Sequence, residues 1–275
     1  HSISSFCNAG FDLFGNSLMD FSADPVVNIT VMLLILAGGL GFTTWADIRR
    51  NLWHFCAYTL QSKIILLMTS ALIILPAIFF LVCENTPDAA GTAHIWASFF
   101  QSVTARTAGY NTIEIEGFSE SGRAILVLLM LIGGSPGSTA GGCKTTTVFT
   151  LLATALAAFR LKKDVTCFSR RLPEETIRQA ITVFMMYLLL FLGGSIFLHR
   201  LDDIPLIDCA FETASAIGTV GLSIGVTEKL SLPSQYVMML LMFFGRIGGL
   251  TVLCAAHANA KADLWRQPEE KIAIG

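Results

Sequence analysis

The chain has 275 residues, of which 53% are hydrophobic and 14% are charged, and its formal net charge is −2. Soluble domains average about 45–50% apolar and about 25% charged residues, so this composition favours a membrane protein. The near-neutral charge gives no electrostatic basis for binding nucleic acid, because that requires a basic patch or stripe.

Uncharged stretches of the length that crosses a bilayer, about 20 residues, recur along the chain. The predicted spans are Pro25 to Ala46, Ile64 to Cys83, Ala124 to Cys143 with an apolar continuation after Lys144 to Phe159, Gln179 to Leu198, and Tyr236 to Ala256, of which the last contains one charge, Arg246. Two shorter apolar stretches, Ile95 to Ala105 and Leu206 to Ile217, have the length of re-entrant helices. Such helices require burial in protein or a water-filled path.

Loop charge predicts the orientation of these spans. Basic residues gather in alternate connections, which are therefore predicted to be cytoplasmic: Arg49, Arg50, Lys63, Arg160, Lys162, Lys163, Arg170, Arg171, Arg178, Lys261, Arg266 and Lys271. The opposite connections carry Glu84, Asp88, Glu114, Glu116, Glu120, Asp202, Asp203 and Glu228. Together, spans and charges indicate a repeated unit of outer span, half-helix, irregular loop and inner span.

Three short segments resemble one another when they are aligned on a glycine. They are Phe6 to Phe11 (FCNAGF), Ala105 to Tyr110 (ARTAGY) and Ile217 to Leu222 (IGTVGL), and we call them segments A, B and C. Their glycines recur at intervals of roughly a hundred residues, about one span-loop-span unit.

This repeat predicts a selectivity filter. A dehydrated potassium ion needs several oxygens at once, and backbone carbonyls can supply them where glycine permits a positive φ. The predicted filter residues are Asn8, Ala9 and Gly10 in segment A, Thr107, Ala108 and Gly109 in segment B, and Thr219, Val220 and Gly221 in segment C. Potassium is expected at the carbonyls near the three glycines. The alternative is that these small residues only allow helices to pack closely.

A glycine-rich run from Gly133 to Thr145 interrupts what would otherwise be one long helix, since helices do not run smoothly through several glycines and a proline. A Walker loop requires glycine before its lysine, and Cys143 occupies that place. A broken helix beside an aqueous path predicts a gate. The predicted gate residues are Gly133, Gly134, Gly137, Ser138, Thr139, Gly141, Gly142, Lys144 and, in the last span, Arg246.

Two simpler interpretations of these residues stay open. The break can be a static kink packed against its neighbours, and Arg246 can extend to the inner surface, because the polar tail is near. A guanidinium inside a span is nevertheless expensive, so we expect Arg246 to face carbonyls, a carboxylate or pore water.

The three segments, Thr104 to Thr112, Gly134 to Thr147, Glu212 to Leu222, Gly245 to Leu250 and the ending Pro268 to Ile272 together resemble the Trk/Ktr/HKT potassium transporter superfamily. The chain is most similar to the membrane subunit of a bacterial Ktr potassium-uptake system.

The resemblance implies an all-α membrane protein with pseudo-fourfold repeats around one pore, in the bacterial plasma membrane. Residues 1–62 correspond to part of the second repeat, 63–165 to the third repeat with a gating loop at 133–144, and 166–275 to the fourth repeat and a cytoplasmic tail. The first repeat and the outer helix of the second have no counterpart here. We therefore expect the chain to begin within a longer sequence.

The resemblance also implies a homodimer seated on a cytoplasmic ring of RCK-type nucleotide-binding subunits. No cofactor is expected in this chain, potassium or sodium is expected in the pore, and ATP or ADP is expected only on the partner. Two other functions are alternatives. A secondary transporter would bind a small solute with broken helices at the membrane midplane. A membrane enzyme lacks support, because His1, His54, His94, His199 and His257 form no metal spacing and no nucleophile pair.

Overall fold

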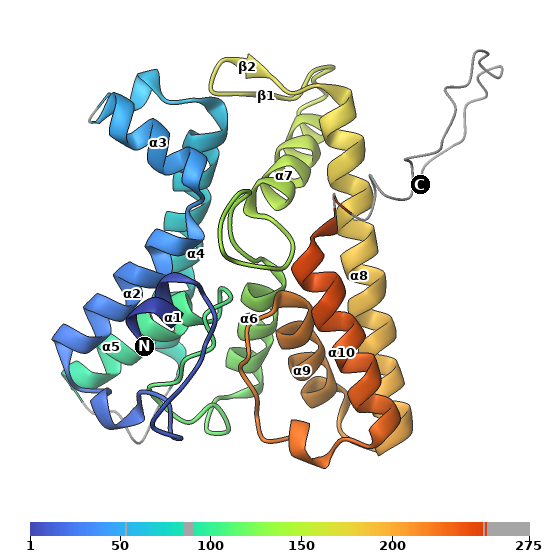
Figure 1. Cartoon of the computed structure of the whole chain (residues 1–275). Helices are drawn as coiled ribbons and strands as arrows, with labels where there is room; N and C mark the ends of the chain where they lie inside the picture. The colour runs from blue at the N-terminus through green and yellow to red at the C-terminus, as the bar shows by residue number, and fades with distance from the viewer. Residues whose placement is uncertain (53, 85–90, 250, 252–275) are drawn as a thin grey trace.

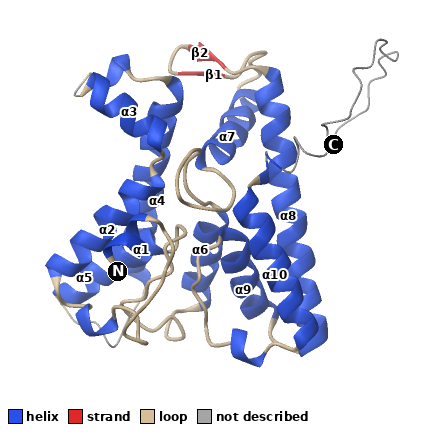
Figure 2. Ribbon diagram, in the orientation of Figure 1, coloured by secondary structure: helices blue, strands red, loops and turns tan. Residues whose placement is uncertain are grey.

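The computed structural model describes residues 1–52, 54–84, 91–249 and 251, and these residues are helical apart from loops and one small hairpin (Figures 1 and 2). In chain order the elements are α1 (Ser2–Phe6), η1 (Met19–Phe21), α2 (Pro25–Gly39), α3 (Phe42–Asn51), η2 (Phe55–Ala57), α4 (Leu60–Cys83), α5 (Thr92–Thr104), α6 (Glu120–Leu131), α7 (Thr145–Phe159), β1 (Thr166–Cys167), β2 (Arg170–Arg171), α8 (Glu174–Asp202), α9 (Leu206–Gly218), η3 (Thr227–Lys229) and α10 (Leu232–Ile247). The predicted all-α class is confirmed.

The same unit recurs along the described chain. A long helix (α4 or α8) runs the height of the molecule, a short helix (α5 or α9) enters only its lower half, and a third helix (α6 or α10) leads back up (Figure 1). The short helices α5 and α9 match the predicted re-entrant stretches. The short helix α1 and α2 repeat the second half of this unit.

The long helices have the apolar surface of membrane spans. Two helices, α4 and α8, are long and apolar enough to cross a bilayer, and the bent pair α2 and α3 makes a third candidate. Large apolar side chains on α4 and α8 are exposed, among them Leu75, Val82, Leu189 and Ile196. An apolar surface of this extent requires lipid or protein contact, because water would destabilise it.

The predicted span Pro25 to Ala46 is wrong as one continuous helix. The chain bends by 99° between α2 and α3. Gly41, with φ of 85°, provides the turn, because glycine adopts positive φ without steric cost. The sequence stretch is uncharged throughout, so hydropathy alone could not locate the bend.

The predicted span Tyr236 to Ala256 is described only in part, and its helix is not continuous. Helix α10 ends at Ile247, and Gly248 follows with φ of 85°. The predicted end at Ala256, and the basic and polar tail from Lys261 to Ile272, lie outside the described residues.

A proline in α4 positions the short helix α5. Pro76 has no N–H, so the carbonyl of Leu72 loses its helical hydrogen bond. The hydroxyl of Ser102 on α5 donates to Leu72 O at 3.2 Å and to Ile73 O at 2.8 Å. The carbonyls that the break in α4 leaves free therefore accept hydrogen bonds from α5, the helix that leads into segment B.

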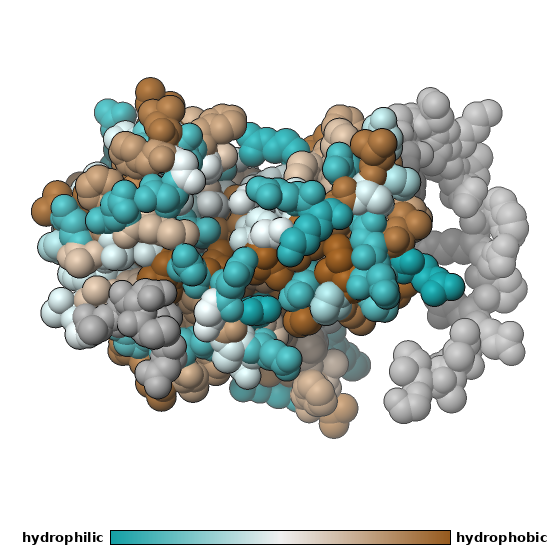
Figure 3. Space-filling view, turned by 90° about the horizontal axis from the view of Figure 1, so that it is seen from below, coloured by the Kyte–Doolittle hydropathy of each residue, from teal (hydrophilic) through white to brown (hydrophobic). Residues whose placement is uncertain are grey.

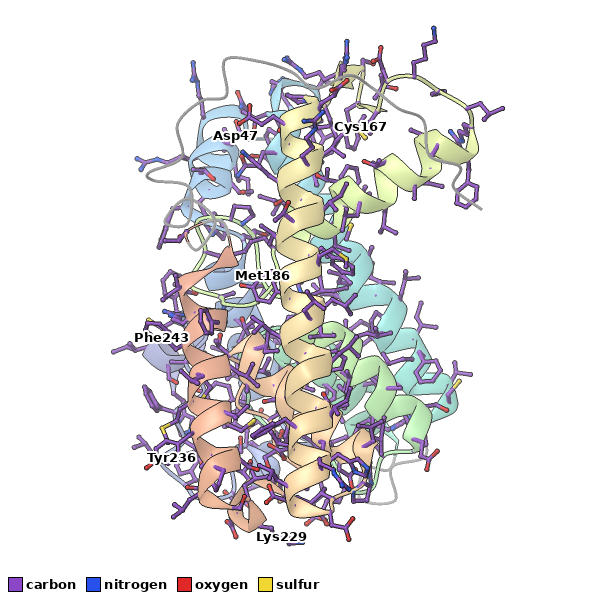
Figure 4. The ribbon with its side chains drawn as sticks, turned by 90° about the vertical axis from the view of Figure 1, so that its right-hand side faces the viewer. Asp47, Cys167, Met186, Lys229, Tyr236 and Phe243 are labelled. Carbon is purple, nitrogen blue, oxygen red and sulfur yellow. The ribbon has the colours of Figure 1, made fainter. Side chains whose placement is uncertain are left out.

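Basic side chains gather at one end of the molecule. Arg49 and Arg50 of α3 and Arg170 and Arg171 of the hairpin lie at the upper end of Figure 1. Asp47 and Cys167 mark the same end in Figure 4, and Lys229 marks the opposite end. Figure 3 looks onto that lower end, where hydrophilic side chains are spread across the surface.

Candidate cation pathway

Segments A, B and C meet, although roughly a hundred residues separate each from the next. A Cβ atom on Gly10 would lie 2.6 Å from the carbonyl oxygen of Ala108 and 3.7 Å from that of Val220. A Cβ atom on Gly109 would collide with the carbonyl oxygen of Val220. Gly10 therefore faces the carbonyl that precedes Gly109, and Gly109 faces the carbonyl that precedes Gly221, so the segments lie side by side in the order A, B, C.

The backbone repeats the same alternation in all three segments. The glycines Gly10, Gly109 and Gly221 have φ of 70°, 81° and 91°. Two residues earlier in each segment, Asn8, Thr107 and Thr219 also have positive φ, of 48°, 78° and 53°. A left-handed conformation at a residue other than glycine costs about 1–3 kcal/mol and is concentrated at functional sites. The three segments thus share one strained backbone conformation, with positive φ at the glycine and two residues before it.

The amides of the segments point back to the short helices. Ala9 N, Ala108 N and Val220 N donate to the carbonyls of Ser4, Thr104 and Ser215 at 2.9, 3.0 and 2.9 Å. The hydroxyl oxygens of the same three residues accept one more amide each, from Phe11 (2.8 Å), Tyr110 (2.8 Å) and Gly221 (3.2 Å). In each segment, one Ser or Thr of the preceding helix therefore accepts two backbone N–H groups. These N–H groups point to the helix and not to the other two segments.

The carbonyls of the segments are left available. Within the described part of the chain, no group donates a hydrogen bond to the carbonyl oxygens of the nine predicted filter residues. Four of these residues, Asn8, Thr107, Ala108 and Val220, are buried, and a buried carbonyl is normally hydrogen-bonded. Free carbonyls on a strained, repeated backbone are what a partly dehydrated cation needs, because their oxygens replace its hydration shell.

The glycine-rich run folds into a closed loop between α6 and α7, which we call the break loop (residues 133–144). Gly133 N donates to Cys143 O at 2.8 Å, and Thr145 N donates to Gly134 O at 3.1 Å, so the loop returns to its starting point. Figure 1 shows it near the middle of the molecule's height.

The break loop contacts the elements around it. Its amides at Ser135 and Thr139 donate to Gly39 O (3.1 Å) and Gly38 O (3.3 Å) at the end of α2. Gly142 N donates to Gly245 O of α10 at 3.3 Å. A Cβ atom on Gly141 would collide with the side chain of Thr219, which places the loop directly against segment C.

Two cations bind loop carbonyls. Arg246 Nη1 donates to Thr139 O at 2.7 Å, and Lys144 Nζ donates to Ala140 O at 2.7 Å. The partial negative charge of these carbonyl oxygens stabilises the two cations, as carboxylates do elsewhere. Of the partners expected for Arg246, the structure shows a backbone carbonyl, that of Thr139.

A cavity of about 760 Å³ runs past segment C. It is lined by Thr219, Val220 and Gly221, by Ala9 of segment A, and by Arg246. A second cavity, of about 390 Å³, borders the break loop at Gly142 and Lys144 together with α7, α8 and the end of α10.

Beyond segment A, Asp12 organises the loop at the lower end. Its carboxylate accepts the amides of Phe14 (3.0 Å), Gly15 (2.7 Å) and Ser17 (2.9 Å). These backbone donors, that of Phe14 first, hold the pKa of Asp12 below its usual value. The carboxylate is therefore charged in any neutral medium.

The structure places all nine predicted filter residues in the three segments that meet, and the predicted gate residues in the break loop and beside it. Sequence reasoning missed Ser4, Thr104 and Ser215, which fix the segment amides. The signal was present, because a hydroxyl residue precedes each glycine by five or six positions.

The fold and the pathway define a class: an all-α, multi-pass membrane protein built as a transporter. The profile of the TrkH family, described as cation transport protein, matches residues 1–266. The chain belongs to this family, which is a family of transporters and not of enzymes.

Similar proteins agree with this assignment. The chain is 39% identical to the potassium/sodium uptake protein NtpJ of Enterococcus hirae and 36% identical to the Ktr system potassium uptake protein B of Bacillus subtilis. These matches cover 100% of this chain but 63% and 62% of the relatives, so the chain spans less than two thirds of their length. The crystal structure of the potassium transporter TrkH from Vibrio parahaemolyticus has the same fold, with a TM-score of 0.74 at 21% identity over 93% of this chain and 57% of that one.

Proposed function

We propose that the intact protein takes up potassium through a channel-like pore whose selectivity filter includes segments A, B and C. The observation that carries this proposal is the convergence of three strained segments with free carbonyls, in which Gly10 and Gly109 each face a carbonyl of the following segment. The relatives named for potassium or potassium/sodium uptake support the choice of ion.

We further propose that the break loop is the gate. It lies against segment C and is held by Arg246, whose charge borders the same cavity as Val220 and Gly221. A cation in that position raises the barrier for other cations unless carbonyls neutralise it. Movement of the loop would therefore change both the width and the charge of the path.

The proposed assembly is the one that the resemblance to the Trk/Ktr/HKT superfamily implies. In this assembly a fourth glycine segment would face Gly221, where a Cβ atom would meet no described atom within 4 Å. The protein would act in the bacterial inner membrane as a homodimer with one pore per subunit. A cytoplasmic RCK ring would bind ATP or ADP and bias the gate.

Substitution of the filter glycines tests the proposal. Gly109→Ser and Gly221→Ser in the intact protein are expected to lower the preference for potassium over sodium by about tenfold, or ~1.4 kcal/mol. The reason is that a side chain at positive φ distorts the carbonyls, and at Gly109 it also collides with Val220 O. The measurement is potassium and sodium uptake into proteoliposomes.

Gly193→Ser is the matched control, because it lies on α8 and a Cβ atom there would meet nothing within 4 Å. Unchanged selectivity in both filter variants, with the control also unchanged, would refute the filter.

A secondary transporter remains the competing function. Inverted repeats would bring successive short helices in from opposite sides. Here α5 and α9 both occupy the lower half of the molecule (Figure 1). The repeats therefore run in the same direction, which favours the channel-like pore.

A further inference from the structure

A buried carboxylate lies behind segment C and has no cation partner among the described residues. Glu212 of α9 is 2% exposed, and no ion pair within 4.0 Å involves it. Burial of an ionised carboxylate is expensive unless hydrogen bonds compensate for lost water. Its position therefore needs a physical reason.

Three donors converge on this carboxylate from the chain that leaves segment C. Oε1 accepts from Ser223 Oγ at 2.6 Å and from Ile224 N at 3.1 Å, and Oε2 accepts from Thr227 Oγ1 at 2.7 Å. Hydrogen bonds to a charged acceptor are about twice as strong as those between neutral groups. Glu212 thus ties residues 223–227 to the helix that precedes the segment.

The same pair of positions is occupied around segment A with the roles exchanged. Glu212 and Ser223 stand nine residues before and two after Gly221, and His1 and Asp12 stand in the same relation to Gly10. His1 Nε2 and Asp12 Oδ1 lie 3.1 Å apart. Around Gly109 the corresponding helix residue is Phe100, which is apolar and fully buried. A hydrogen-bonded carboxylate therefore braces two of the three segments.

Glu212 also borders the ion path. It lines the cavity of about 760 Å³ together with Val220, Gly221 and Arg246. A negative charge in a low-dielectric wall raises the local concentration of cations.

We propose that Glu212 is a positioning residue of the pore: its hydrogen bonds hold the outer return of segment C, and its charge attracts cations to the cavity. This inference rests on the proposed filter. It separates two properties, because a neutral isostere removes the charge and keeps a polar group that can still hydrogen-bond to the hydroxyls, whereas an apolar side chain removes all of these hydrogen bonds.

The test compares variants of the intact protein in proteoliposomes. Glu212→Gln keeps one acceptor oxygen for Ser223 and Ile224, and its NH2 group can donate to the Thr227 hydroxyl, which rotates to accept. We therefore expect the potassium concentration for half-maximal uptake to rise roughly tenfold while selectivity is retained. Glu212→Met is expected also to lower the preference for potassium over sodium, by about threefold or more.

Glu84 supplies the matched control. It is also buried, and its carboxylate accepts from the amide and the hydroxyl of Ser119, a residue that belongs to none of the three segments. Glu84→Gln and Glu84→Met should leave affinity and selectivity unchanged. If Glu212→Met does not fold, the double variant Ser223→Ala with Thr227→Val removes two of the three donors and should shift selectivity in the same direction.

The inference is overturned if folded Glu212 variants, or the double variant, keep wild-type affinity and selectivity, or if the Glu84 variants shift them equally. Failure of the filter itself is distinguishable, since it would appear as unchanged selectivity in Gly109→Ser and Gly221→Ser.

Discussion

Thr139 is the residue through which the break loop contacts segment A. Its hydroxyl donates to Phe6 O at 3.1 Å and accepts from Asn8 Nδ2 at 3.3 Å, and its carbonyl accepts from Arg246. One threonine thus joins the loop, the first segment and the cation of the last helix. Its position connects the proposed filter to the proposed gate.

Removal of the Thr139 hydroxyl is expected to free the loop. Thr139→Val keeps the shape and loses both side-chain hydrogen bonds, each with a net value of about 0.5–1.5 kcal/mol. Potassium flux should therefore rise about two- to tenfold, with unchanged preference over sodium. Thr139→Ser, which keeps the hydroxyl, should restore wild-type flux in the same proteoliposome assay.

Thr154→Val is the control for this substitution. The Thr154 hydroxyl donates to Thr150 O within α7, so its loss removes no hydrogen bond of the break loop. A flux in Thr139→Val no higher than in the control would argue against the anchoring role.

At the scale of elements, the backbone groups that two helix interruptions leave free form hydrogen bonds with each other. The bend between α2 and α3 and the break between α6 and α7 both free backbone groups. Three hydrogen bonds join them: Ser135 N to Gly39 O, Thr139 N to Gly38 O, and Phe42 N to Gly137 O. Unsatisfied backbone inside a membrane costs several kcal/mol per group, so neither interruption is stable without the other.

Deletion of Gly137 to Gly142 tests whether the break loop closes the path. The deletion removes the loop carbonyls that hold Arg246 and Lys144, and the loop residue that lies against Thr219. Flux should rise, because the obstruction is gone. Size-exclusion chromatography establishes that the variant is folded, and a folded variant with equal or lower flux would contradict the gate.

At the scale of the whole molecule, the proposed partners act from the basic end. The cations Arg49, Arg50, Arg170 and Arg171 gather there, and the positive-inside rule predicts that this end is cytoplasmic. The bend at Gly41 connects α3, at this end, to the residues that hold the break loop. A partner that moves α3 would therefore move the loop.

The partner proposal predicts that nucleotides act only through a second protein. Uptake by the purified intact membrane protein alone should not respond to ATP or ADP. Addition of a regulatory subunit of the RCK type should make uptake differ between the two nucleotides. A direct nucleotide effect on the membrane protein alone would contradict this division of roles, and light scattering would test the dimer.

The sequence by itself determined the membrane class, the long helices and the segments that carry Gly10, Gly109 and Gly221. Hydropathy and the conformational freedom of glycine are properties of short stretches, so a chain shows them before it folds. The resemblance then supplied the family. The bend at Gly41 was missed, because an uncharged stretch has the same hydropathy whether it is straight or bent.

Only the tertiary structure decided which groups meet. The left-handed conformation of Thr107 and Thr219 is imposed by packing, since free β-branched residues avoid it. The contact of Thr139 with Phe6, and that of Glu212 with Thr227, join residues from different parts of the chain. Such hydrogen bonds depend on where whole helices dock, and no local pattern encodes that placement.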